Sequence, residues 1–176
     1  MINGLVHVYT GDGKGKTTAA IGQGMRSAGR GLKVYMVQFL KSADTGELHA
    51  CQQLGESFKI FRFEKQRGFF WTLNEEQKNE LKSEIRQALQ FVRKVFDKKE
   101  CDVLILDEIM GVITNQLVSE EEICDFIRKK PQSMELILTG RDAPKSIIEL
   151  ADYVSEIHAV KHPMDKGIVA RYGIEY

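Results

Sequence analysis

A glycine-rich segment near the start of the chain carries the side chains best suited to binding a polyphosphate. Residues 5–18 read LVHVYTGDGKGKTT, an apolar run that leads into alternating glycines and then into Lys16, Thr17 and Thr18. Glycines let backbone N–H groups converge on an anion without interference from Cβ atoms. Lys16 adds a positive charge, and a threonine hydroxyl is a ligand for Mg²⁺. The segment therefore predicts a phosphate loop for a nucleoside triphosphate.

This loop is one residue shorter than the common pattern, which reads G-x-x-x-x-G-K-[ST]. The common spacing would put the first glycine at position 10, but the chain has Thr10 there and its first glycine is Gly11. A glycine-rich β-turn that happens to contain GKT is the alternative. The apolar run before the loop and a helix expected over 16–29 favour the phosphate loop, because a helix N-terminus attracts anions.

Two carboxylates end a second apolar run. The segment 103–109 reads VLILDEI, and a carboxylate at the end of such a strand can hold Mg²⁺ beside a phosphate loop. An apolar run that ends in two acids is also a common strand terminus, but its combination with the phosphate loop favours the metal. We favour Glu108 as the metal-facing carboxylate, with Asp107 as a close second.

Several other polar residues have two interpretations each. Arg141 follows the run LILTG, where its guanidinium can neutralise a polyphosphate or lie on the surface of a turn. Gln38 and Lys41 lie at the end of another expected strand. Each of them is either a ligand contact or part of a solvated loop. His162, beside a proline, is structural or lines the pocket. The sequence offers no catalytic base or nucleophilic side chain.

Three successive aromatic residues, Phe69, Phe70 and Trp71, precede the longest helical pattern. Core packing is the usual explanation of aromatic side chains. Three in a row in a loop, including the only tryptophan of the chain, can instead form a flat wall for a large planar ligand.

Apolar runs and helical patterns alternate from end to end, and this alternation predicts the frame that positions these residues. We expect one domain over residues 1–176 with a three-layer, doubly wound α/β fold and a mostly parallel sheet, of the P-loop NTPase (RecA-like) type. Ligands of such a fold lie at the carboxyl ends of its strands. The expected strands are 5–9, 33–39, 58–63, 102–107, 134–139 and 153–158.

The clearest helix is predicted over 74–97, where apolar residues recur at three- and four-residue steps. Thr72 and Glu75 are expected to form the capping box of this helix. Ser119 with Glu122 gives the same signal for a second helix. A proline at Pro144, near the first turn, opens a third.

The composition is that of an ordinary globular protein. With 25 basic and 25 acidic residues among 176, the chain gives no indication of a nucleic-acid surface. Cys51, Cys101 and Cys124 are odd in number and widely spaced, which indicates a reduced cytoplasmic protein. We expect no secretory signal and no membrane partner, since a strand begins within a few residues of the N-terminus and no apolar run is long enough to span a bilayer.

The chain resembles the P-loop ATP:corrinoid adenosyltransferases of cobalamin biosynthesis and salvage, whose shortened phosphate loop it shares. The resemblance implies transfer of the 5′-deoxyadenosyl group of ATP to the Co(I) of a reduced corrinoid, with release of triphosphate. The nucleophile is then the metal of the substrate, and no catalytic base is needed. The resembling segments are TGDGKGKTTAA (10–20), VQFLK (37–41), GFFW (68–71), LDEI (106–109), LTGRDAP (138–144), LADYVSEI (150–157) and KHPMDKGIVARYGIEY (161–176).

The same resemblance implies a role for individual residues. Lys16, Glu108 and Arg141 are the expected catalytic residues, which serve the triphosphate and Mg²⁺, and Phe69 and Trp71 lie on the corrinoid side. The implied metal ligands are Thr17, Glu108 and Asp107. The implied ATP-binding residues are Gly11, Asp12, Gly13, Lys14, Gly15, Lys16, Thr17, Thr18 and Arg141. A homodimer and a transient flavoprotein electron donor are implied as partners.

Two other classes of function remain open from the sequence. A P-loop ATPase or nucleoside kinase would need a catalytic base or a water-positioning residue, and none is evident. A non-catalytic regulator that binds ATP or a corrinoid would form no Co–C bond.

Overall fold

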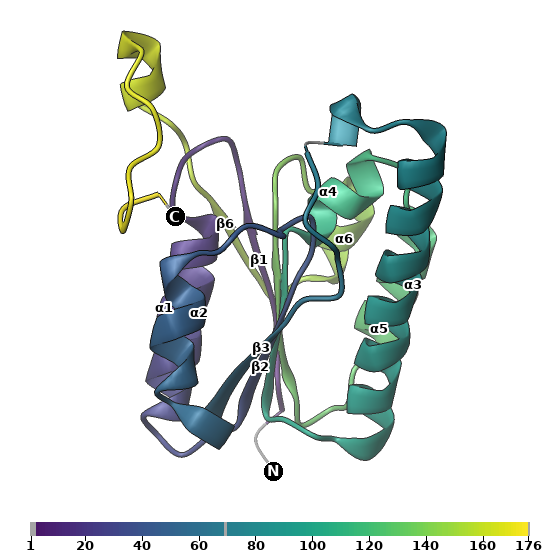
Figure 1. Ribbon diagram of the computed structural model, residues 1–176. Helices are drawn as coiled ribbons and strands as arrows, with labels where there is room; N and C mark the ends of the chain where they lie inside the picture. Colours follow the sequence, from purple (N-terminus) through teal and green to yellow (C-terminus); the bar gives the residue numbers. More distant parts are fainter. Residues whose placement is uncertain (1–2, 69, 176) are drawn as a thin grey trace.

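The computed structural model describes residues 3–68 and 70–175 and has an α/β fold in three layers (Figure 1). Its sheet has six strands in the order β3-β2-β4-β5-β1-β6, and every pairing is parallel. The predicted doubly wound α/β class is therefore confirmed. The strands are β1 (Val6–Thr10), β2 (Val34–Gln38), β3 (Phe58–Phe61), β4 (Val103–Asp107), β5 (Glu135–Thr139) and β6 (Tyr153–Glu156).

Helices cover both faces of the sheet (Figure 1). On one face lie α1 (Lys16–Ala28) and α2 (Gly46–Gln52). The opposite face is covered by α3 (Glu75–Lys98), α4 (Ile109–Thr114), α5 (Glu120–Lys129) and α6 (Lys145–Leu150). Three short 3-10 helices complete the elements: η1 (Gly55–Ser57), η2 (Phe70–Thr72) and η3 (Pro163–Lys166).

The central strands are buried on both faces, as parallel strands between helices must be. All five residues of β2 and all five of β4 are buried. Along β2, Val34 and Met36 face the smaller core under α1 and α2, whereas Tyr35 and Val37 face the larger core under α3. The period-two alternation of a strand thus builds two cores from one segment.

All six predicted strands are present, but several boundaries differ from the prediction. The capping box of α3 is made by Asn74 and Gln77, not by Thr72 and Glu75, because Thr72 belongs to η2. The Asn74 side chain accepts the Gln77 N–H at 2.9 Å, and the Gln77 side chain accepts the Asn74 N–H at 3.0 Å.

Other helix starts were anticipated more closely, and two short helices were missed. Ser119 caps α5 by accepting the N–H of Glu122 at 3.2 Å, as predicted. Pro144 is the N-cap residue of α6 and lies just before its first turn. The helices α2 and α4 have seven and six residues, too few to show a helical period in the sequence.

The carboxyl ends of the strands meet at one edge of the sheet. The strand register places Gln38 beside Asp107 and Tyr9 beside Thr139. In Figure 1 this edge is at the top, where the loop from β1 to α1 lies. No helix among residues 3–68 and 70–175 is long and apolar enough to cross a membrane.

The chain ends in an arm that stands away from the sheet (Figure 1). This C-terminal arm, residues 157–175, follows β6 and contains η3. Much of its apolar surface is exposed, notably at Val160, Val169 and Tyr172. The strand β6 is an edge strand, and all four of its residues are exposed.

Candidate active site at the carboxyl edge of the sheet

The predicted phosphate loop connects β1 to α1. Gly11 and Gly15 have φ values of 101° and 126°, which side chains with a Cβ rarely adopt. A Cβ on Gly11 would also come within 2.3 Å of the Ile157 carbonyl oxygen, so the loop packs directly against the backbone after β6. Gly15 is the N-cap of α1 and makes no side-chain cap. The first N–H groups of α1 are therefore directed at the loop, where they attract anions.

The ammonium group of Lys16 lies inside this loop. It donates to the carbonyl oxygens of Gly11 and Gly13 at 2.7 and 2.8 Å. Burial of the side chain, followed by the nearby Arg141 guanidinium, lowers the pKa of Lys16 below its usual range. Because Lys16 and Arg141 are cations at the same cavity, a bound polyphosphate would relieve their mutual repulsion.

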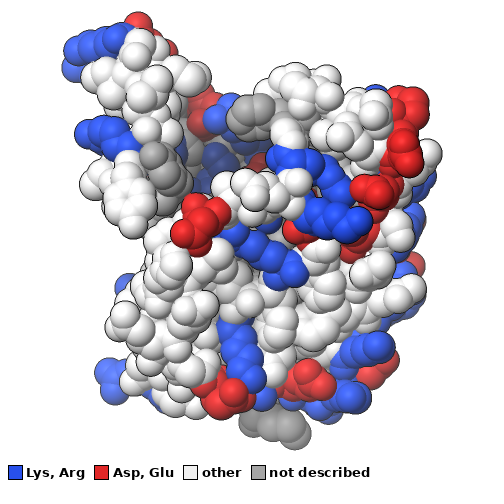
Figure 2. Space-filling view, viewed as in Figure 1, with Lys and Arg blue, Asp and Glu red and all other residues white. Residues whose placement is uncertain are grey.

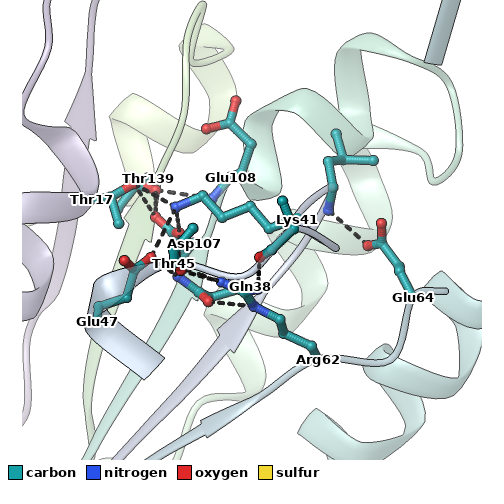
Figure 3. Close-up of polar contacts among 12 residues, drawn as sticks. Thr17, Gln38, Lys41, Thr45, Glu47, Arg62, Glu64, Asp107, Glu108 and Thr139 are labelled. Carbon is teal, nitrogen blue, oxygen red and sulfur yellow. Dashed lines mark hydrogen bonds and ion pairs between the residues drawn. The ribbon is translucent and has the colours of Figure 1, made fainter. Parts of the chain in front are cut away.

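Asp107, at the end of β4, is the centre of a polar cluster (Figure 3). Its side chain is fully buried. Oδ1 accepts the hydroxyl groups of Thr17 at 2.9 Å and Thr139 at 2.7 Å. Oδ2 accepts the Lys41 ammonium at 2.8 Å and the Gln38 amide at 3.3 Å. The end of β4 is thereby bonded to α1, β2 and β5 at once.

Glu108 is directed differently from its neighbour. It has a left-handed backbone (φ 63°) at the N-cap of α4, and its N–H donates to the Thr139 hydroxyl at 2.9 Å. Figure 3 shows its carboxylate pointing away from the Asp107 cluster. Burial, followed by the charge of Asp107, raises the pKa of Glu108. The two adjacent carboxylates therefore have different environments, one bonded on both oxygens and one facing a cavity.

The oxygen donors at this edge fit Mg²⁺. Thr17 supplies a hydroxyl, and Asp107 and Glu108 supply carboxylates, all of which are hard ligands. No cluster of three or more His, Cys, Asp or Glu suited to a metal occurs in the described part of the chain.

A cavity of about 510 Å³ opens over the phosphate loop, and we call it the nucleotide cavity after the ligand that the loop predicts. The C-terminal arm contributes to its wall through His162 and residues 173–175. Figure 2 shows the molecule hollowed between this arm and its main body, with basic side chains in the hollow. From the remainder of the chain the cavity is lined by Asp12, Gly13, Lys14, Gly15, Lys16, Thr17, Thr18, Ile21, Lys41, Thr45, Gly46, Glu47, Glu108 and Arg141.

Asp12 holds the base of the arm. Its carboxylate accepts the N–H of Ala159 at 3.2 Å and lies 3.7 Å from His158. The hydrogen bond from Ala159 lowers the pKa of Asp12. The loop residue that adds a negative charge near the expected phosphates is thus turned toward the arm.

A second cavity of about 540 Å³, the apolar cavity, lies next to the first. Leu73, Leu81 and Phe70 line it, and so does Trp71. The Trp71 side chain is 77% exposed, so the core-packing interpretation of this residue is wrong. Phe69, the other aromatic residue assigned to the corrinoid side, lies outside the described residues.

The two cavities share three lining residues: Lys41, Thr45 and Glu108. The sequence left Lys41 open between a ligand contact and a solvated loop, and the structure brings its ammonium group to the Asp107 cluster. Thr45 and Thr139 were not singled out. The signal for Thr139 was available, since it ends an apolar run just before Gly140 and Arg141.

The parallel sheet, the phosphate loop before α1 and the carboxylates at the end of β4 define an α/β P-loop protein of the RecA type. The fold is similar to that of the KaiC-like protein PH0186 from Pyrococcus horikoshii, with a TM-score of 0.51 and 17% identity over 89% of this chain and 73% of that chain. At that identity the likeness concerns the fold alone.

The chain belongs to the ATP:corrinoid adenosyltransferase family BtuR/CobO/CobP, whose model matches residues 2–176. It is 35% identical to a corrinoid adenosyltransferase of Escherichia coli K12 over 98% of this chain and 86% of that protein. Corrinoid adenosyltransferase CobA of Salmonella typhimurium LT2 is 34% identical over the same shares. The chain therefore has corrinoid adenosyltransferase activity, and the resemblance seen in its motifs is confirmed.

Proposed function

We propose that the nucleotide cavity binds ATP and the apolar cavity binds the reduced corrinoid. The observation that carries this assignment is the wall that the cavities share, because a group passing between two substrates needs adjacent sites. In the transfer, the electron pair of Co(I) forms a bond to C5′ of ATP. The C5′–O bond breaks, and its electrons leave with inorganic triphosphate. No proton has to be removed from either substrate.

In this proposal the protein stabilises the leaving group. Lys16, Arg141 and the N-terminus of α1 supply positive charge where triphosphate charge develops. Mg²⁺, held by Thr17 with Asp107 and Glu108, would neutralise further phosphate charge. Backbone N–H groups at the end of the loop and the start of α1 complete the proposed phosphate cradle.

The corrinoid side is assigned to the aromatic segment before α3. Trp71 is exposed and lines the apolar cavity. Phe69, two residues earlier in the sequence, is proposed to contact the corrinoid together with Trp71. An apolar wall against the lower face of the ring would exclude an axial ligand from cobalt, which favours reduction to Co(I). A transient flavoprotein donor is the proposed source of the electron.

We further propose a cytoplasmic homodimer. The three cysteines are free and buried, which suits a reducing compartment. The edge strand β6 and the C-terminal arm expose apolar side chains that a second copy could cover, including Tyr153, Val160 and Val169. Sedimentation of the purified chain, with and without ATP, tests the dimer.

An anaerobic assay with ATP, Mg²⁺ and a chemically reduced corrinoid tests the reaction. We expect the spectrum of the adenosylated product together with one inorganic triphosphate per product. Release of orthophosphate instead would indicate a P-loop ATPase or kinase. Binding of both substrates without a Co–C bond would indicate a regulator.

A further inference from the structure

The wall between the two cavities is a short backbone segment that follows β2. Lys41 and Thr45 of this segment line both cavities, while Leu40 and Ala43 line only the apolar one. We call residues 40–45 the shared wall. Any displacement of the shared wall changes the shape of both cavities together.

The shared wall begins with an unfavourable backbone conformation. Leu40 has a φ of 54°, a left-handed value that costs free energy for a residue with a branched side chain. Its N–H donates to Glu64 Oε1 at 2.7 Å (Figure 3). A carboxylate that accepts a backbone N–H forms a strong, charge-assisted bond. Glu64 therefore stabilises the turn at Leu40.

The turn at Leu40 decides where the next side chain points. From there the Lys41 ammonium reaches Asp107 Oδ2 at 2.8 Å and Thr17 Oγ1 at 3.2 Å. These are two of the three residues proposed to hold Mg²⁺. A continuous path of contacts therefore leads from Glu64 through the backbone of Leu40 to the phosphate side of the nucleotide cavity.

Glu64 itself lies on the other side of this path, in the lining of the apolar cavity. Its neighbour Arg67 lines the same cavity and is held in place by Glu84 at 2.5 Å and by Glu80 at 3.2 Å. Burial raises the pKa of Glu64 to about 7, the charge of Glu84 adds to this increase, and the Leu40 N–H, Arg67 and Arg62 oppose it. The Glu64 carboxylate is thus held by the Leu40 N–H and lies in the field of a charged cluster that lines the apolar cavity.

We propose that Glu64 is a positioning residue that couples the two cavities. By accepting the Leu40 N–H, Glu64 fixes the shared wall. The Lys41 ammonium therefore stays beside the departing triphosphate when a corrinoid occupies the apolar cavity. Glu64 touches no reacting atom in this role. The inference rests on the proposed assignment of ATP and corrinoid to the two cavities.

A double-mutant cycle tests the coupling. Glu64→Ala removes the acceptor and should lower kcat by about tenfold, whereas Glu64→Gln keeps an oxygen acceptor and should stay within about twofold of the wild type. In a Lys41→Ala background, Glu64→Ala should cause no further loss of kcat, because the ammonium group that Glu64 positions is already absent. Losses that multiply, or a Glu64→Gln variant as impaired as Glu64→Ala, would overturn the proposal.

Matched variants exclude a purely structural effect. Glu76→Ala removes an exposed carboxylate of α3 that lines neither cavity, and its kcat should match the wild type. Glu64→Asp keeps the charge but withdraws the carboxylate from Leu40, so it replaces Glu64→Ala if that variant does not fold. A kcat loss in Glu76→Ala equal to that of the Glu64 variants would count against a specific role.

Failure of this inference is distinguishable from failure of the cavity assignment. Trp71→Ala probes the apolar cavity, whereas the Glu64 variants probe the hydrogen bond to Leu40 in the shared wall. A raised corrinoid KM in Trp71→Ala together with an additive Glu64–Lys41 cycle would reject only the positioning role. An unchanged corrinoid KM in Trp71→Ala would reject the assignment on which that role rests.

Discussion

Individual residues of the site hold the phosphate loop and the end of β4 in shape, and the same residues are proposed to bind the substrate. Lys16 bonds the carbonyls of Gly11 and Gly13, and Asp107 bonds two hydroxyls and an ammonium group. These contacts pre-organise the charges before a nucleotide arrives, which is the main way in which a site lowers the barrier to charge separation.

Lys16→Ala should abolish detectable turnover. Loss of one buried charged contact to phosphate costs about 2–4 kcal/mol of transition-state stabilisation. Rates measured under anaerobic conditions, with circular dichroism to verify folding, check this expectation. Lys82→Ala, at an exposed position on α3, is the control and should behave like the wild type. Near-normal turnover of Lys16→Ala would be incompatible with the phosphate-loop assignment.

Arg141→Lys should be far from conservative. An ammonium group cannot reproduce the bidentate fork of a guanidinium on triphosphate oxygens, so we expect a loss of about tenfold or more in kcat/KM for ATP. Arg128→Lys makes the same exchange on the outer surface of α5, where Arg128 pairs with Glu121. If both variants keep ATP affinity and turnover within about twofold, Arg141 is only a surface residue.

Glu64 should make the stability of the protein depend on pH. Its pKa is raised to about 7 in the folded state, so between its ordinary value and pH 7 the folded state holds a proton that the unfolded state has released. Stability must then fall as pH rises through that window. Glu64→Gln should reduce this fall by about 1–2 kcal/mol, discounted for partial exposure.

Urea unfolding at several values between pH 5 and about pH 8 measures this difference. Glu76→Gln, which removes an exposed carboxylate from α3, should retain the wild-type dependence. Equal slopes for the wild type and Glu64→Gln would contradict the raised pKa.

At the scale of elements, the strands were predictable and the short connecting pieces were not. Every residue of β2 and β4 is buried, and only the last residue of each, Gln38 and Asp107, is polar, which is the pattern of a parallel strand covered on both faces. The site residues at strand ends followed from that frame. The shared wall could not be predicted, because the left-handed turn at Leu40 depends on Glu64, which is distant in sequence.

The carboxylate pair shows the same limit at the end of one strand. The sequence shows that Asp107 and Glu108 are adjacent, but it does not show which of them faces a cavity. The backbone torsion at Glu108 and hydroxyl groups from α1 and β5 decide this. These hydroxyl groups come from two other segments of the chain. Their geometry is therefore a property of the folded sheet.

The η2 segment is expected to serve the corrinoid alone. Trp71→Ala should raise the corrinoid KM by about tenfold and leave the ATP KM unchanged, because the side chain lines only the apolar cavity. The melting temperature should change little, since a largely exposed side chain contributes little core packing. Met25→Ala, an exposed apolar change on α1, is the matched control.

One set of measurements on Trp71→Ala checks in solution that this side chain serves the corrinoid and does not stabilise the fold. Truncation of a core residue would lower the free energy of unfolding by about 3–5 kcal/mol. It would then weaken the use of both ATP and corrinoid, because part of the protein would be unfolded. Parallel loss of both activities with a large fall in melting temperature would reject the corrinoid wall.

At the scale of the whole molecule, the residues that stabilise the fold and the residues of the candidate site lie in different parts of the structure. The two cores fill the space between the sheet and its helices, whereas the charged cluster and both cavities lie at the carboxyl edge. Substitutions at that edge should therefore alter catalysis with modest effects on folding, apart from buried members of the cluster such as Asp107.

The C-terminal arm has a practical consequence for anyone who purifies this protein. Ile174 and Glu175 lie at the mouth of the nucleotide cavity, whereas Gly4 bonds to Gln132 near the opposite edge of the sheet (Figure 1). An affinity tag that follows these residues would emerge beside the cavity proposed to bind ATP, and a polyhistidine sequence there would add charge and metal-binding groups next to that cavity. We expect a C-terminally tagged preparation to have a higher KM for ATP, restored by cleavage of the tag, and an N-terminally tagged one to match the untagged enzyme.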